Sequence, residues 1–154
     1  MIRLFEEKDA EEVVNLTIRC FKEINSLVYP PEVIEFMISR HNPERIISKA
    51  KKTTCLVFED DCKIIGTVSL DKNYIFSLYV NPDYQGKGIG KQLMKSAEDI
   101  IFKEYNNITL NASLNSLIFY EEIGYIKKEE IYQEDYGKTY LMEKQLNKDI
   151  VKNI

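Results

Sequence analysis

The 154-residue sequence is poor in the residues that build metal sites and nucleophilic triads. It has one histidine, His41, and three cysteines, Cys20, Cys55 and Cys62, none of them in a C-x-x-C spacing. A single histidine cannot supply a His-rich metal site or a Ser-His-Asp triad. Scattered cysteines of odd number do not form a disulfide framework. We therefore expect no metal, three buried or half-buried cysteines, and chemistry carried by carboxylates, tyrosines and backbone groups.

Long apolar runs and blocks of positive charge are also missing. No apolar run approaches the ~20 residues that cross a bilayer, and Met1 to Glu7 lacks the apolar core of a signal peptide. The formal net charge is -4 and the pI about 5.2, with lysines and arginines spread along the chain. The sequence therefore predicts a cytoplasmic protein without a membrane or nucleic-acid partner.

The length and composition fit one domain. Hydrophobic residues make up 44% of the chain, enough for a single core at this size. The sequence shows no internal repeat, low-complexity tract or Pro/Gly/Ser linker. We expect one domain over residues 1–147, followed by a polar C-terminal tail over 148–154.

The spacing of apolar residues predicts a mixed α/β (α+β) fold, with a central sheet of about six to seven strands flanked by helices. Its main elements follow the order β-α-α-β-β-β-α-β-α-β-β, with a further short helix before the second strand. A crossover through the long helix makes the fourth and fifth strands parallel neighbours. The predicted strands are 2–5, 53–59, 63–70, 74–80, 108–112, 125–132 and 139–145; the predicted helices are 9–24, one from Pro31, 43 to about 50, 89–102 and 116–123.

A glycine-rich turn, Gln85-Gly86-Lys87-Gly88-Ile89-Gly90, joins the strand at 74–80 to the longest amphipathic helix. Free N–H groups and the helix dipole favour an anion at such a junction. A Rossmann fingerprint would need glycine at Lys91, and a Walker A loop would need glycine at Gln85 and Ser or Thr at Gln92. A turn that only reverses the chain is the alternative, but three alternating glycines at a helix start favour a bound phosphate group.

Two motifs resemble those of the GNAT superfamily of N-acetyltransferases. Residues 78–90, LYVNPDYQGKGIG, are similar to its central Q/R-x-x-G-x-G/A motif. Asn115 to Tyr125, NSLIFYEEIGY, is similar to its later N-x-x-x-x-F/Y-Y-x-x-x-G-F/Y motif. The resemblance covers Ile2 to about Leu146 and is weakest between Leu27 and Lys52. It implies a single-domain GNAT-like fold and transfer of an acetyl group from acetyl-CoA to a primary amine.

The resemblance also implies roles for individual residues. Tyr120 would protonate the departing CoA sulfur, and its alternative role is core packing. Asn115 would hydrogen-bond the pantetheine arm; its alternative role is to cap the helix at 116–123, and the two roles are compatible. A backbone N–H at Leu78 or Tyr79 would polarise the thioester carbonyl. The expected cofactor-binding residues are Leu78, Tyr79 and Val80 along the strand, Gln85, Gly86, Lys87, Gly88, Ile89, Gly90 and Lys91 at the turn, and Asn115.

The general base and the acceptor stay open at this point. Asp71, Glu32 and Glu35 are candidate bases, and a chain of waters is another. Tyr29 is a candidate wall of the acceptor pocket, and packing between helices is its alternative role. The acceptor is a primary amine of a small molecule or a peptide. A CoA-binding sensor or inactive relative, and a structural or toxin-partner protein, are the competing functions; a homodimer is a possible assembly.

Overall fold

The computed structural model describes residues 1–146, so the predicted tail over 148–154 lies outside them. It contains a seven-stranded sheet in the order β1-β2-β3-β4-β5-β7-β6, which confirms the predicted mixed α/β fold. Predicted element boundaries agree with it to within about two residues. The strands are β1 (Ile2–Leu4), β2 (Thr54–Asp60), β3 (Lys63–Asp71), β4 (Tyr74–Val80), β5 (Asn107–Ala112), β6 (Ile126–Gln133) and β7 (Gly137–Gln145); the helices are α1 (Ala10–Glu23), α2 (Pro31–Ser39), α3 (Pro43–Lys52), α4 (Ile89–Ile101) and α5 (Leu117–Glu122).

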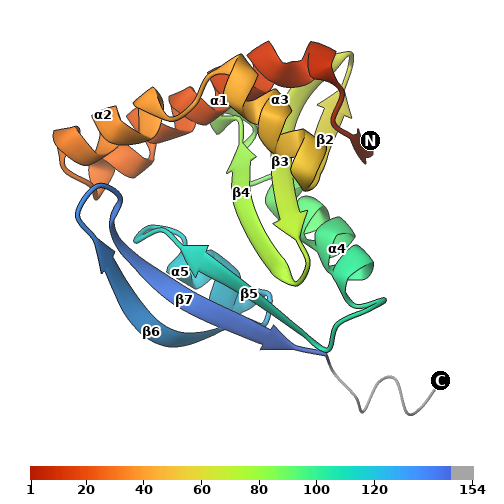
Figure 1. Cartoon of the computed structure of the whole chain (residues 1–154), viewed down its shortest axis with the longest axis vertical. Helices are drawn as coiled ribbons and strands as arrows, with labels where there is room; N and C mark the ends of the chain where they lie inside the picture. The colour runs from red at the N-terminus through yellow and green to blue at the C-terminus, as the bar shows by residue number, and fades with distance from the viewer. Residues whose placement is uncertain (147–154) are drawn as a thin grey trace.

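Helices cover both faces of the sheet (Figure 1). Successive side chains of a strand point to opposite faces, and the central strands are apolar on both. Val57 and Ile64 pack against Val13 and Leu16 of α1. The opposite face packs against Leu93 and its neighbours on α4, in a larger core that also includes Tyr120 of α5. The two clusters place α1 and α4 on opposite sides of β2 to β4.

The sheet opens in its middle. β4 and β5 are parallel, as predicted, but they pair only through Tyr74 with Thr109 and Ile75 with Leu110. Beyond these pairs the two strands diverge, and Figure 1 shows β5, β6 and β7 swinging away from β4. The wedge between them opens toward the carboxyl end of β4, where the glycine-rich turn begins.

The cysteines fall in two classes. Cys20 and Cys55 are buried, as predicted, but Cys62 is exposed, so the expectation of three buried or half-buried thiols was wrong for Cys62. Asp61 and Cys62 form the two-residue turn between β2 and β3, with φ angles of 49° and 62°. This left-handed hairpin turn projects its side chains into solvent. Among residues 1–146, no helix is long and apolar enough to span a membrane.

Candidate active site

The turn after β4 has the backbone of an anion-binding loop. Gly86 and Gly88 have φ angles of 77° and 80°, in the left-handed region that glycine adopts without strain. A Cβ atom at either position would meet nothing within 4 Å, so the space in front of the turn is open. The glycines are therefore required by backbone conformation, and they leave room for a ligand to approach the main chain.

The first turn of α4 presents unpaired backbone donors. Gly88 is the N-cap residue and supplies no side-chain cap, and the first turn of α4 contains no acidic residue. The N–H of Gln92 donates to the carbonyl of Gly88 at 3.1 Å, so the N–H groups that precede Gln92 at the helix start have no partner within the helix. These donors and the positive end of the helix dipole together favour an anion.

Two other motif residues have structural roles at this turn. The side-chain amide nitrogen of Gln85, Nε2, donates to the carbonyl of Val80 at 2.9 Å, which closes the loop onto the end of β4. A Cβ atom on Gly90 would lie 3.2 Å from Cζ of Phe119. Glycine at position 90 therefore lets α4 approach α5 closely, a reason that the motif alone did not reveal.

A cleft of about 460 Å³ occupies the wedge between β4 and β5. All the predicted site residues line it except Lys87, whose ammonium instead lies 5.1 Å from the centre of the Tyr84 ring. The cleft thus brings the two sequence motifs to one place. Its lining residues are Cys20, Phe21, Ile24, Asn25, Met37, Ile75, Phe76, Ser77, Leu78, Tyr79, Val80, Tyr84, Gln85, Gly86, Gly88, Ile89, Gly90, Lys91, Asn111, Ser113, Asn115, Ser116, Phe119 and Tyr120.

β4 carries a β-bulge where it borders the cleft. Tyr79 pairs with Thr67 and Phe76 with Ser69, so two residues of β4 oppose Val68 alone. Ser77, in this bulge, has a φ angle of 55°, an uncommon conformation for a residue with a side chain. A bulge interrupts the regular ladder and leaves a residue unpaired. The main chain of β4 is therefore bent at the middle of the cleft.

Tyr120 combines core packing with a place in the cleft wall. Its ring lies edge-on to Phe119 and Tyr125, with centroids 5.1 and 5.8 Å away. Tyr125 directs its own hydroxyl to Glu98 at 2.8 Å. The Tyr120 hydroxyl makes no hydrogen bond within residues 1–146. Its oxygen is not fully buried, so a ligand or water can reach it. Burial raises the pKa of the Tyr120 phenol, so the group stays protonated at neutral pH.

Asn115 holds the far wall of the cleft against α1. Its amide nitrogen donates to the carbonyl of Ile24 at 3.0 Å, and its amide oxygen accepts from Asn25 at 3.3 Å and from Ser113 at 3.1 Å. The alternative role as a helix cap was wrong, because the N-cap of α5 is Ser116. Asn115 joins the end of α1 to the start of the second motif.

The other candidates lie outside the cleft. The hydroxyl of Tyr29 donates to the carbonyl of Lys138 at 2.6 Å and accepts from the N–H of Leu114 at 3.0 Å. Tyr29 therefore packs between elements, which was its alternative role. The exposed Asp71, Glu32 and Glu35 are not part of the cleft wall. Within residues 1–146, no carboxylate lines the cleft.

Several cleft residues were not predicted. Phe21, Ile24, Asn25 and Met37 come from α1, the turn after it and α2. They lie more than forty residues before the motifs in the chain, and their sequence pattern indicates only an amphipathic helix. Asn111 offered a weak signal, because it is a polar residue in a strand with buried neighbours on either side.

Comparisons with known proteins identify the class of enzyme. A family model described as the acetyltransferase (GNAT) domain matches residues 18–146. The S-(2-succino)cysteine N-acetyltransferase of Bacillus subtilis is 28% identical over an alignment of 169 positions, gaps included, that covers 96% of this chain and 97% of that protein. The chain is thus an acyltransferase of the GNAT class. The chain belongs to the GNAT family of N-acetyltransferases.

Solved structures share the fold. A GCN5-related N-acetyltransferase from Rhodopseudomonas palustris superposes with a TM-score of 0.88 at 21% identity, over 95% of each chain. The PaiA N-acetyltransferase of Thermoplasma acidophilum, solved with coenzyme A, superposes with a TM-score of 0.79 at 23% identity, over 94% of this chain and 98% of that one. At these identities the likeness concerns the fold alone.

Proposed function

We propose that the protein transfers the acetyl group of acetyl-CoA to a primary amine of a small molecule or a peptide, by direct attack in a ternary complex. One observation carries this proposal: a single cleft is lined both by the glycine-rich turn at the start of α4 and by Tyr120. The proposed cofactor-binding residues are those predicted from the sequence. Lys87 lies outside the cleft wall, so its role would be electrostatic.

The phosphate end of the cleft fits the pyrophosphate of CoA. The open space before Gly86 and Gly88 admits phosphate oxygens to the main chain, and the N–H groups at the start of α4 are the donors they require. The pantetheine arm would follow β4, with the backbone of Leu78 to Val80 along one side. Asn115 would contribute through the wall that it holds in place and through its second amide N–H, since only one of the two donates within the protein.

The chemistry needs a neutral amine, a polarised thioester and a proton for the leaving group. The amine nitrogen attacks the carbonyl carbon, the carbon–sulfur bond breaks, and the thiolate takes the proton of the Tyr120 hydroxyl. The tyrosinate recovers a proton from solvent. A backbone N–H of the bulged strand, at Leu78 or Tyr79, would stabilise the oxyanion. Thiols ionise near pH 8.5 and burial raises the pKa of Tyr120, so this proton transfer is uphill and reprotonation of the tyrosinate by solvent completes it.

Water is the proposed acceptor of the amine's proton. Asp71, Glu32 and Glu35 lie outside the cleft, which favours water over these three carboxylates. The single domain over 1–147, the cytoplasmic location and the possible homodimer stay predictions from the sequence.

The Bacillus subtilis relative suggests one specific acceptor to test. Its name assigns S-(2-succino)cysteine, and the match spans nearly the whole of both chains. We include this compound among the first amines to be tried.

The experiment is a CoA-release assay with acetyl-CoA and a set of primary amines, with the acetylated product identified by mass spectrometry. An amide product whose formation matches CoA release is the expected result. A CoA-binding sensor, the competing function, would bind acetyl-CoA and yield no amide with any amine. Loss of acetyl-CoA without amide formation, which would be hydrolysis, would also contradict the proposal.

A further inference from the structure

The side of the cleft that faces α1 and α2 is walled by neutral groups. Phe21, Ile24 and Met37 project from the helical side, and Phe76 and Tyr79 from β4. All the lining residues belong to the described part of the chain, and the charged side chain among them is Lys91 at the phosphate turn. An acceptor amine entering from this side therefore meets apolar and aromatic surface.

Two further polar side chains line the cleft, Tyr79 on β4 and Asn111 on β5. The ring of Tyr79 is held edge-on by Phe21 at 5.4 Å and by His41 at 6.4 Å. Its hydroxyl makes no hydrogen bond within residues 1–146, and burial raises the pKa of the phenol, which stays neutral. On the opposite wall Asn111 of β5 is exposed, and its amide also lacks a hydrogen-bond partner in that range. Both groups can donate a hydrogen bond to an oxygen of the acceptor.

The neutral wall restricts which amines can react. Apolar surroundings disfavour an ammonium ion, and only the unprotonated amine is a nucleophile. An α-amine of a peptide has a pKa near 8 and a lysine ε-amine a pKa near 10.4, so at pH 7 the unprotonated fractions differ by roughly 200-fold. An α-amine also has a carbonyl oxygen three bonds away, where a neutral donor can orient it.

We infer that the acceptor is an α-amine beside a carbonyl group, as in an amino-acid derivative or a peptide N-terminus, and that the Tyr79 hydroxyl and the Asn111 amide hold that carbonyl. This inference rests on the proposed acetyltransferase function and names its substrate class. It disfavours polyamines and lysine side chains, whose amines are more basic and have no neighbouring carbonyl.

The first test uses two amides of the same amino acid. In Nε-acetyl-lysine amide only the α-amine is free, and in Nα-acetyl-lysine amide only the ε-amine is free. At pH 7 we expect kcat/KM to be at least about 100-fold higher for the free α-amine. The ratio should fall as the pH rises toward 10, because the ε-amine then loses its proton. A tetrapeptide with a free N-terminus distinguishes the two sources, and its acetylation would assign the activity to peptides.

Equal rates for the two amides, or a faster ε-amine, would overturn the inference. If acetyl-CoA binds by calorimetry and neither amide nor peptide is acetylated, the α-amine class is wrong while the cofactor assignment stands. If acetyl-CoA does not bind, the proposed function itself fails.

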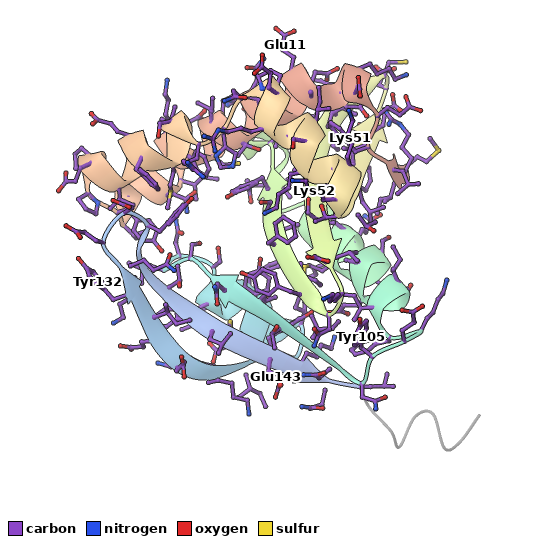
Figure 2. All side chains as sticks on the ribbon, in the orientation of Figure 1. Glu11, Lys51, Lys52, Tyr105, Tyr132 and Glu143 are labelled. Atoms are coloured by element: carbon purple, nitrogen blue, oxygen red, sulfur yellow. The ribbon has the colours of Figure 1, made fainter. Side chains whose placement is uncertain are left out.

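A variant tests the orienting role of Tyr79. Tyr79→Phe keeps the ring and removes the hydroxyl, so we expect the KM for the α-amine to rise about 3- to 10-fold, as for one lost hydrogen bond. The affinity for acetyl-CoA should not change. Tyr132→Phe is the matched control, because Tyr132 lies exposed on β6 at the outer edge of the sheet (Figure 2). An unchanged KM in Tyr79→Phe would remove this residue from the acceptor site.

Discussion

The two ends of the cleft are built by different means. The phosphate end is backbone from one continuous segment, Gln85 to Lys91, whose glycines free the main chain for a ligand. The acceptor end is made of side chains from α1, α2, β4 and β5, brought together by the opening between β4 and β5. A backbone site can hold the same cofactor in many sequences. A side-chain site changes with each substitution, so we expect specificity for the amine to reside at the acceptor end.

The largest effect should come from the hydroxyl where the two ends meet. Tyr120→Phe removes the proposed proton donor and keeps the ring that packs on Phe119 and Tyr125. We expect kcat to fall by about 10²- to 10⁴-fold, the usual range for a general acid, with acetyl-CoA affinity and thermal stability unchanged. Steady-state kinetics and calorimetry measure these quantities. Tyr105→Phe is the control outside the cleft, and an unchanged kcat in Tyr120→Phe would show that water supplies the proton.

Thiol reactivity separates the closed wall of the cleft from the surface. Cys20 lies in the wall and donates to the carbonyl of Val80 at 3.2 Å. Burial raises its pKa to about 11, so at pH 8 about one Cys20 thiol in a thousand is ionised and able to react. Labelling of the protein with a thiol reagent should slow by at least about 100-fold in Cys62→Ser, which lacks the exposed thiol. Labelling of the Cys62→Ser variant should become faster as the pH rises toward 11, because Cys20 then ionises. Fast labelling of the variant at pH 8 would mean that α1 does not cover the end of β4.

The hydrogen bonds that support the acceptor end can be removed without changing the phosphate end. Tyr29→Phe deletes the hydroxyl that bridges Leu114 and Lys138 and leaves a backbone N–H and a carbonyl without that partner. We expect the free energy of unfolding to drop by about 2 kcal/mol, measured by denaturant titration. The KM for the amine should rise, and the affinity for acetyl-CoA should be retained. Equal losses at both ends would contradict a separate acceptor end.

The smallest effect concerns charge at the phosphate end. Lys91 lines the cleft in the first turn of α4, where a lysine opposes the helix dipole. Lys91→Gln should weaken acetyl-CoA binding about threefold at low salt and less at high salt, because salt screens an exposed charge. Lys95→Gln is the control, since Lys95 lies one turn further and pairs with Asp99 at 3.4 Å. An equal effect of both variants would assign the change to net charge alone.

The sequence predicted the fold and the position of the glycine-rich turn well, because both depend on local patterns. Alternating and helical periodicities located the strands and helices, and the spacing of Gly86, Gly88 and Gly90 identified the turn. It did not predict the acceptor end, since Phe21 and Met37 follow ordinary amphipathic patterns and reach the cleft only through the packing of α1 and α2. Cys62 was misjudged for a similar reason, because its exposure depends on a two-residue hairpin turn.

The most direct test of the account is calorimetric titration of acetyl-CoA into Gly88→Asp and Gly88→Asn. Both side chains have nearly the same size and tolerate the left-handed conformation at this position, so the two proteins differ in one negative charge before the start of α4. We predict that the Asn variant keeps measurable affinity and that the Asp variant binds at least about 100-fold more weakly, because its carboxylate occupies the place of the pyrophosphate. Equal, strong binding by both variants would contradict the claim that this turn holds the phosphates of the cofactor.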